Sequence, residues 1–273
     1  MLSRGRERLE GSDRLRIIAV IPARMGSSRF PGKPMALIHG MPMIGHCYMR
    51  VSRCKDLDGV YVATCDQEIY DYIRSIGGNV VMTADTHERA SDRAAEAMIQ
   101  IEEVTGQRTD ILVMVQGDEP MDTPEMISEA ISPMLLDESI KVVNLASTID
   151  SLEEFQDSNT VKVVIDKHSK AIYFSREAIP SKAKWGGKLP MKKQVCIIPF
   201  RRNFLLEFNQ LDETLLEKVE SIDMLRLLEN GEKVHMVTTR YNSIGVDTKA
   251  HLLRVEELMS NDPLMHEYLE TAV

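Results

Sequence analysis

Residues 17–34 read IIAVIPARMGSSRFPGKP, and this stretch decides the fold. Its first five residues are apolar and mostly β-branched, which is typical of a strand buried in a parallel sheet. Pro22 ends the run, and a segment rich in Gly, Ser and Arg follows it. The sequence therefore predicts a buried strand that leads into a loop at its carboxyl end.

This loop carries three cations, Arg24, Arg29 and Lys33, together with two glycines. Glycines let backbone N–H groups approach an anion, and Arg and Lys neutralise several phosphate oxygens at once. A phosphate-binding loop is favoured over a solvated basic turn. Pro34 follows Lys33, so the GxxxxGK[ST] pattern is absent, as is GxGxxG. ATPase-type and dinucleotide-binding functions are therefore disfavoured.

Short apolar runs alternate with helical periods along the first half of the chain. The runs cover residues 59–64, 80–83 and 111–115, and the helical segments cover residues 67–76 and 91–104. This alternation predicts an α/β fold with a mostly parallel sheet flanked by helices. Later runs are more closely spaced, at 142–146, 161–165, 171–174, 195–198 and 234–237, with a helix expected over 215–228. This half is expected to hold mixed or antiparallel pairing.

The chain has 273 residues, 43% hydrophobic and 27% charged, the composition of a globular protein with a sizeable core. No Ser/Gly/Pro-rich linker interrupts it, so one continuous domain over residues 16–258 is simpler than two. An inserted lobe is expected around residues 170–210. Residues 1–15 are interpreted as a flexible charged leader and residues 259–273 as a C-terminal tail.

Charge and cysteine usage exclude several classes of protein. The net charge of −9 has the wrong sign for a protein that binds nucleic acid through its overall field. The cysteines Cys47, Cys54, Cys65 and Cys196 show no CxxC spacing, so neither a zinc site nor a disulfide framework is indicated. We find no membrane-length apolar segment and no secretory signal, and we expect a cytoplasmic protein.

Two acidic residues follow strand-like runs. Asp118 lies in VQGDEP (115–120) and Asp247 lies in SIGVDT (243–248). Mg²⁺ usually takes one or two carboxylates plus substrate phosphates, so both residues are candidate metal ligands. An ordinary Gly-Asp turn at Asp118 and a helix cap around Asp247 and Thr248 are the alternatives.

A third polar cluster, Ser91-Asp92-Arg93, lies at the start of an expected helix, where anions and polar ligand groups are attracted. A capped helix with an exposed ion pair is equally compatible with these residues. The histidines have no metal-ligand spacing, and GxSxG is absent, so covalent hydrolase chemistry is unsupported.

The strings PARMGSSRFPGKP, VQGDEP, YFSREAIP and GVDT, in this order, resemble the 3-deoxy-manno-octulosonate cytidylyltransferase family, also called CMP-Kdo synthetases. The similarity spans roughly residues 16–258. It implies a Rossmann-like nucleotidyltransferase sheet, CTP and Mg²⁺ as co-reactants, a homodimer and a role in lipopolysaccharide biosynthesis. The implied reaction transfers CMP to the anomeric hydroxyl of an acidic sugar and releases pyrophosphate.

The resemblance also assigns candidate residues. The expected catalytic residues are Arg24, Lys33, Asp118 and Asp247, of which Asp118 and Asp247 are the metal ligands. The expected nucleotide-binding residues are Ala23, Arg24, Ser27, Arg29, Lys33, Ser91, Asp92, Arg93 and Gln116. The expected acceptor-binding residues are Arg176, Gln194, Glu220 and Asp223.

The acceptor half departs from the family pattern. Where the family reads HLGIYGYR, residues 194–201 read QVCIIPFR, so a His and a Tyr become Gln194 and Ile198. Where the family reads ExLEQLR, Asp223 and Met224 replace Glu and Gln, and PWDR becomes PSKA at 180–183. Loss of polar partners in a hydroxyl-binding site favours a changed acceptor over drift with compensation by Lys182, Lys184 or Lys188. An amino-substituted octulosonate, a nonulosonate and a small phosphonate are the alternatives.

Two other classes of function remain. A non-catalytic CTP-binding protein would bind the nucleotide and form no product, which the retained metal carboxylates disfavour. An NTP hydrolase would release orthophosphate without an acceptor, which the missing Walker motif disfavours.

Overall fold

The computed structural model describes residues 14–27 and 29–271, so most of the expected leader lies outside the described residues. Its first sheet has the strand order β11-β6-β1-β4-β5. The strands are β1 (Ile17–Ala23), β4 (Gly59–Thr64), β5 (Val80–Met82), β6 (Ile111–Val115) and β11 (Ile197–Arg201). Only β11 is antiparallel to its neighbour, so the expected mostly parallel sheet is confirmed.

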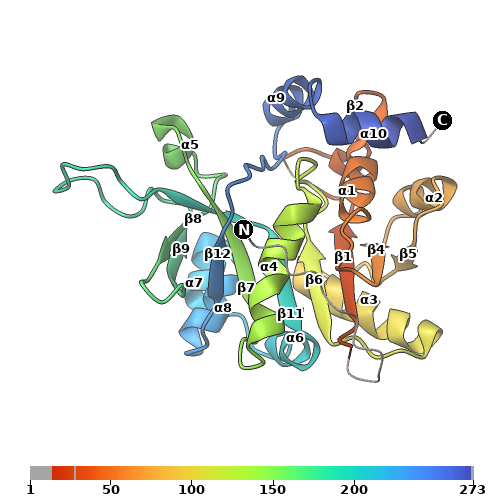
Figure 1. Cartoon of the computed structure of the whole chain (residues 1–273), viewed down its shortest axis with the longest axis horizontal. Coiled ribbons are helices and arrows are strands. Elements are labelled where there is room, and N and C mark those ends of the chain that lie inside the picture. The colour runs from red at the N-terminus through yellow and green to blue at the C-terminus, as the bar shows by residue number, and fades with distance from the viewer. Residues whose placement is uncertain (1–13, 28, 272–273) are drawn as a thin grey trace, which may run out of the picture.

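Residues of β1 alternate between two apolar layers, one on each face of the first sheet. Figure 1 shows helices on both sides of this sheet. Ile17, Ala19 and Ile21 belong to one cluster, which includes residues of α1 (Met43–Val51), α2 (Gln67–Ser75) and α4 (Pro124–Leu136). Ile18 and Val20 belong to a second cluster, which includes residues of α3 (Ala90–Thr105), α6 (Arg202–Phe208) and α8 (Met224–Glu229). Helices on both faces bury β1 completely, which explains why its sequence lacks polar alternation.

The register of the first sheet brings the polar loops together. Ala23 at the end of β1 is opposite Thr64, and Val20 is opposite Met114 of β6. Both strands run in the same direction, so the basic loop after β1 and the QGD turn after β6 leave the sheet at the same edge. This edge is where ligands of open α/β sheets bind.

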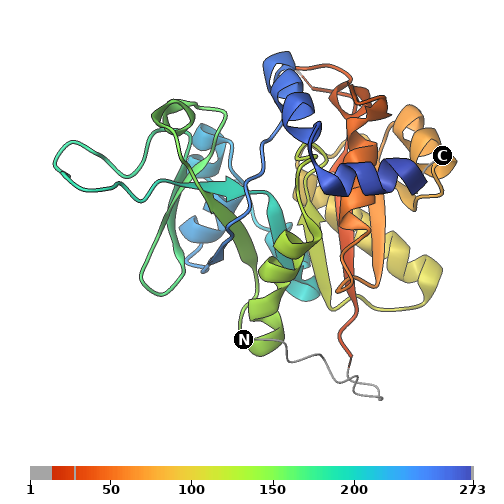
Figure 2. The ribbon, with the colours of Figure 1, turned by 45° about the horizontal axis from the view of Figure 1, so that its top comes forward.

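A second, mixed sheet has the order β12-β7-β10-β8-β9. Its strands are β7 (Val143–Thr148), β8 (Lys162–Ile165), β9 (Ala171–Ser175), β10 (Lys192–Val195) and β12 (His235–Thr238). β12 is parallel to β7, and the other pairs are antiparallel. The segment 170–210 contributes to both sheets, because β10 passes through Cys196 directly into β11 of the first sheet. The loop between β9 and β10 projects away from both sheets (Figure 2).

The single helix expected over 215–228 is wrong, because the structure has two helices there. α7 (Leu215–Glu220) ends at Ser221, which adopts a left-handed conformation with φ 54°, and α8 follows. The Glu220 and Ser221 carbonyls accept hydrogen bonds from Arg176, so the break presents both oxygens to another part of the chain.

The remaining elements are short or lie near the C-terminus. They are η1 (Lys33–Met35), β2 (Leu37–Ile38), β3 (Met41–Pro42), α5 (Leu152–Gln156), α9 (Lys249–Met259) and α10 (Pro263–Thr271). Of these, α5 packs beside the second sheet. The expected C-terminal tail contains α10, which packs on α1 through a 2.5 Å contact between His46 Nδ1 and the buried Tyr268 hydroxyl. Within residues 14–27 and 29–271, no helix has the length and apolar character needed to cross a membrane.

Candidate active site

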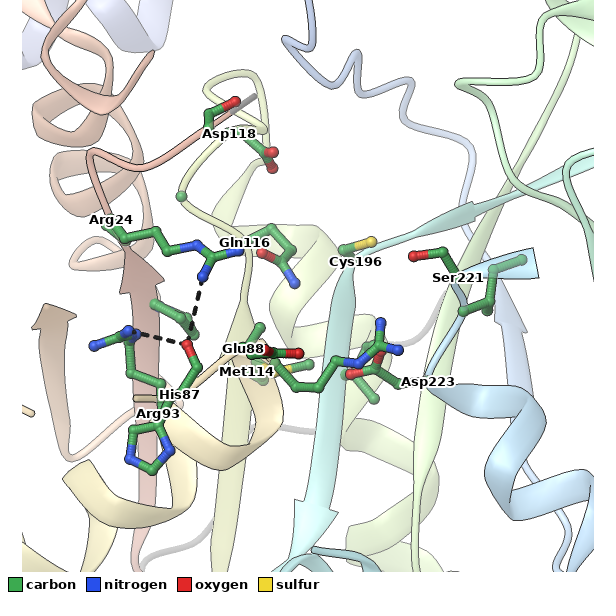
Figure 3. A pocket seen from close by; sticks show the side chains of 18 of the residues that line it. Arg24, His87, Glu88, Arg93, Met114, Gln116, Asp118, Cys196, Ser221 and Asp223 are labelled. Atoms are coloured by element: carbon green, nitrogen blue, oxygen red, sulfur yellow. Dashed lines mark hydrogen bonds and ion pairs between the residues drawn. The ribbon is translucent and has the colours of Figure 1, made fainter. Parts of the chain in front are cut away.

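A cavity of about 550 Å³ opens at the carboxyl ends of β1 and β6, between the first sheet and the segment around α8 (Figure 3). Most of the residues that the sequence marks as a site line it. They are Ala23, Arg24, Ser27, Arg29, Lys33, Arg93, Gln116, Asp118, Arg176, Gln194 and Asp223. Ser91, Asp92, Glu220 and Asp247 do not line the cavity. The basic loop, the QGD turn and the acceptor-side residues therefore face one shared space.

The loop between β5 and α3 forms one wall and is held by two guanidinium groups. Arg24 Nη1 and Arg93 Nη2 both donate to the His87 carbonyl, at 3.5 and 3.4 Å (Figure 3). Arg93 is buried and also donates to Thr83 Oγ1 and the Ala84 carbonyl, so it fixes this loop. The Arg24 side chain is exposed and makes a single long hydrogen bond within the described chain. Its positive charge therefore remains available to a bound anion.

Lys33 joins the two candidate metal ligands. Its Nζ lies 2.5 Å from Asp118 Oδ2 and 3.5 Å from Asp247 Oδ1. Arg29 Nη2 lies 2.9 Å from the same Asp247 oxygen. Burial alone would lower the pKa of Lys33, but the two carboxylates outweigh it and raise the pKa above its ordinary value. The ammonium group is therefore protonated and bridges two carboxylates that are distant in sequence.

The helix cap near Asp247 is made by its neighbour. Thr248 caps α9, because its Oγ1 accepts a 3.2 Å hydrogen bond from the His251 N–H. The Asp247 carboxylate is thus left to face Lys33. The Val246 N–H donates to the Asp118 carbonyl at 2.8 Å, which ties the two acidic loops together.

The donor set at this point fits Mg²⁺. Asp118 and Asp247 offer hard carboxylate oxygens on either side of a cation, and Mg²⁺ is commonly held by one or two carboxylates plus substrate phosphates. The described residues contain no group of three or more His, Cys, Asp or Glu side chains placed to hold a metal by themselves. A bound metal would thus need oxygen ligands from the substrate as well.

Behind Asp118 lie buried acids that sequence reasoning missed. Burial raises the pKa of Glu119 well above its ordinary value, and the neighbouring Asp122 and Asp118 add to the shift. Burial likewise raises the pKa of Asp122. Glu119 Oε1 accepts a 3.2 Å hydrogen bond from the N–H of Cys196, which lines the cavity. Glu119 stands inside the VQGDEP motif, but nothing in that string distinguishes a buried acid from a solvated one.

The Ser91-Asp92-Arg93 triplet divides between the cavity and its surroundings. Ser91 is fully buried, and its Oγ lies 3.3 Å from Asp223 Oδ2. Asp92 is half-buried in the first turn of α3. Arg93 alone of the three lines the cavity. Ser91 therefore acts through Asp223, which does line it.

The side of the cavity where the sequence predicts acceptor binding contains a guanidinium held by backbone oxygens. Arg176 donates from Nε to the Glu220 carbonyl at 2.7 Å, from Nη1 to the Ser158 carbonyl at 3.0 Å, and from Nη2 to the Ser221 carbonyl at 3.4 Å. The Glu220 carboxylate lies outside the cavity and accepts from the Arg176 N–H and Ser175 Oγ, at 2.8 and 2.7 Å. Glu220 thus orients Arg176, whose guanidinium lines the cavity.

An ion pair lies on the same side of the cavity. Arg89 Nη1 lies 3.5 Å from Asp223 Oδ1, and Arg89 Nη2 lies 3.1 Å from Glu213 Oε1. Burial raises the pKa of Asp223, while Arg89 opposes the shift. Sequence reasoning missed Arg89, because its partners are more than a hundred residues away. Cys196, Ile198 and Met224 are among the other residues that line the cavity.

Comparison with known proteins adds to this geometry. Residues 18–234 match the model of a family described as cytidylyltransferase. The chain is 43% identical to the 3-deoxy-manno-octulosonate cytidylyltransferase of Geobacter metallireducens over 256 residues, covering 90% of this chain and 98% of the relative. It is also 43% identical to that of Pelobacter propionicus, over 89% of this chain and 97% of the relative.

Solved structures agree with the sequence comparison. The structure of a CMP:2-keto-3-deoxy-manno-octonic acid synthetase complexed with CTP matches with a TM-score of 0.82 at 37% identity, covering 90% of this chain and 99% of that chain. A 4-diphosphocytidyl-2C-methyl-D-erythritol synthase from Anaerococcus prevotii matches with a TM-score of 0.59 at 15% identity, over 90% of this chain and 97% of its own. The second similarity concerns the fold alone.

Proposed function

The chain belongs to the cytidylyltransferase family, and we propose that it transfers CMP from CTP to the anomeric hydroxyl of 3-deoxy-manno-octulosonate or a similar acid, releasing pyrophosphate. The relatives named for this activity are similar over nearly their whole length. The observation that carries the proposal is the meeting of Asp118, Asp247 and Lys33 at the edge of one cavity. This arrangement places carboxylates for a divalent ion beside cations for a triphosphate.

On the nucleotide side, positively charged residues surround the expected triphosphate. Arg24 and Lys33 would stabilise the charge that grows on the departing pyrophosphate. Ser27 and Arg29 line the cavity from the same loop, and Gln116 lines it directly after β6. Phosphoryl-type transfer of this kind depends mainly on positioning and charge stabilisation, so no protein nucleophile is required.

Asp118 and Asp247 would hold Mg²⁺ together with phosphate oxygens of the substrate. When bound, Mg²⁺ supplies positive charge to these oxygens and lowers the proton affinity of the acceptor hydroxyl. In the protein without ligand, the Lys33 ammonium bridges the two carboxylates, and Arg29 also pairs with Asp247.

On the acceptor side, Arg176 is the candidate partner of the acid's negative group. Its guanidinium is bound by carbonyl oxygens and has no carboxylate partner among the described residues, so its charge is not neutralised. Gln194 and Asp223 line the same region and are the candidate partners of polar groups on the acceptor.

A changed acceptor within the same reaction is the second candidate. Ile198 and Met224 offer no hydrogen bond at two positions of the acceptor wall. A wall of this kind favours an acid with fewer or differently placed hydroxyls than 3-deoxy-manno-octulosonate. Amino-substituted octulosonates, nonulosonates and small phosphonates are the acids to compare.

The test is a pyrophosphate-release assay with CTP and Mg²⁺ held fixed and the acid varied. We expect release that depends on the acid, and a CMP conjugate of equal amount. CTP binding without pyrophosphate release for every acid would instead indicate a non-catalytic CTP-binding protein. Orthophosphate release without any acid would indicate a hydrolase.

The proposal also includes a cytoplasmic location and a homodimer. All four cysteines are free, which fits a reducing compartment. The homodimer follows from the family resemblance, and light scattering of the purified protein tests it.

A further inference from the structure

The buried side chain of Asn144 on β7 has a fixed orientation. Its Nδ2 donates to the Leu145 carbonyl and to the Val195 carbonyl, both at 2.9 Å. Carbonyl oxygens only accept hydrogen bonds, so the amide nitrogen must face them. Asn144 is fully buried, and reversing its amide would leave buried groups without partners. Its Oδ1 atom is therefore directed away from these carbonyls.

This oxygen fixes the neighbouring amide of Gln194. Asn144 Oδ1 accepts a 2.6 Å hydrogen bond from Gln194 Nε2. Gln194 lies opposite Ala146 in the antiparallel β7–β10 pair, so it shares a face of the sheet with Asn144, two positions along β7. Since Asn144 Oδ1 can only accept, the nitrogen of Gln194 must point toward β7. Its Oε1 atom is on the other branch of the amide.

The backbone of Gln194 is fixed as well, because its N–H donates to the Val161 carbonyl at 2.8 Å. The side chain is half-buried and lines the cavity. No group in residues 14–27 or 29–271 donates a hydrogen bond to its Oε1. Ile198 and Met224, which line the same cavity, are apolar. The amide oxygen thus has no hydrogen-bond partner among the described residues, and it belongs to a side chain that lines the cavity.

We propose that Gln194 presents its amide oxygen to the acceptor, that Asn144 positions this amide, and that the enzyme thereby selects acids with a hydrogen-bond donor at the facing position. The inference rests on the proposed function and narrows its substrate class. The acceptor substituent that faces the Gln194 amide oxygen is a hydroxyl or an amino group. A methoxy, keto or carboxylate substituent only accepts, so it would place two unpaired acceptors against each other.

The test uses 3-deoxy-manno-octulosonate and derivatives in which one hydroxyl at a time is replaced by an amino or a methoxy group. With the wild-type protein, we expect one position of the acid at which hydroxyl and amino derivatives react, while the methoxy derivative has a kcat/KM about 10- to 100-fold lower. Gln194→Met keeps an unbranched side chain and removes the amide. It should raise KM for the acid by about tenfold or more, reduce the methoxy discrimination at that position to within about threefold, and leave KM for CTP unchanged.

Asn144→Leu tests the positioning role. It releases the Gln194 amide, which can then turn its nitrogen toward the acceptor, so the variant should lose most of the methoxy discrimination although Gln194 is retained. A merely structural role would alter thermal stability without altering this ratio. Thr148→Val is the matched control, because it removes the 2.9 Å hydrogen bond from Lys192 Nζ to Thr148 Oγ1 in the same strand pair, outside the cavity. The control should keep the wild-type ratio.

The outcomes distinguish a failure of the proposed function from a failure of the inference about Gln194 alone. Absence of pyrophosphate release from the wild-type protein with every acid overturns the proposed function and this inference with it. Release by the wild-type protein, with the same methoxy discrimination in Gln194→Met, overturns this inference alone. If Asn144→Leu does not fold, Gln194→Met still decides, because its side chain lies at the cavity surface.

Discussion

Lys33 Nζ lies 2.5 Å from Asp118 Oδ2, although 85 positions separate the two residues in the sequence. The basic loop after β1 and the turn after β6 meet because both strands are parallel neighbours in one sheet. The Lys33 ammonium thus lies beside the same carboxylates that a divalent ion would bind. This contact links the phosphate-binding loop to the candidate metal ligands.

Asp118→Asn should lower kcat by about 10²-fold or more and leave the fold intact. The amide keeps the shape of the side chain but removes the charge that a metal ion and Lys33 both require. Steady-state pyrophosphate release measures the effect, and thermal unfolding checks the fold. Glu138→Gln, a change at an exposed acid outside the cavity, is the control and should behave as the wild-type protein. Near-normal turnover of Asp118→Asn would contradict the assignment.

Lys33→Met should make the protein more dependent on divalent ions for stability. Without the ammonium group, the Asp118 and Asp247 carboxylates are left facing each other without their shared cation. Mg²⁺ should then raise the melting temperature of the variant more than that of the wild-type protein, with CTP absent from both. Equal shifts in the two proteins would show that the carboxylates do not bind the ion together.

Much of the first sheet could be predicted from the sequence. The run at 17–21 is buried on both faces, and a continuous series of apolar residues is typical of such strands. The helix over 215–228 could not be predicted correctly, because its apolar period continues across the break. Ser221 turns left-handed where Arg176 binds the neighbouring carbonyls, and such a tertiary contact leaves no local signal.

The candidate site could likewise be predicted only in part. Arg24, Lys33 and Asp118 follow strand ends, so a parallel sheet predicts that they lie at the same edge. Arg89 and Asn144 could not be found, because their importance lies in partners from distant strands and helices. Spacing along the chain contains no information about such pairs.

Stability should fall as pH rises, in part through Asp122. Burial raises the pKa of this carboxyl in the folded protein, so the folded state holds its proton over a pH range where the unfolded state has lost it. The stabilisation is present below the ordinary pKa of Asp and is lost as pH rises through the raised value.

The measurement is urea unfolding of the wild-type protein and Asp122→Asn at about pH 5 and about pH 8. Asn stays neutral, so the variant should lose less unfolding free energy over this interval. Its loss should be smaller by about 1 kcal/mol or more. Glu119 also has a raised pKa, so the variant should retain part of the pH dependence. An equal or larger loss in the variant would show that Asp122 is ionised in the folded state.

Arg226→Met should destabilise the fold more than any surface change near the site. Glu217 is fully buried, and Arg226 binds it from Nε at 2.7 Å and from Nη2 at 2.6 Å. Removing one partner of a buried ion pair leaves an uncompensated charge, at a cost of about 3–5 kcal/mol in unfolding free energy. Arg89 Nε, 3.8 Å from Glu217, is too distant and too engaged elsewhere to replace the lost partner.

The pair spans α7 and α8, on either side of the break at Ser221, so its loss should also disturb Asp223 and raise KM for the acid more than KM for CTP. Urea unfolding and two-substrate kinetics measure the two effects. The double variant Glu217→Leu, Arg226→Met should recover most of the lost stability, because no buried charge is then left unpaired. If the double variant is no more stable than Arg226→Met, packing of the Arg226 side chain on Phe208, 4.7 Å from the ring centre, carries the stabilisation instead of its charge.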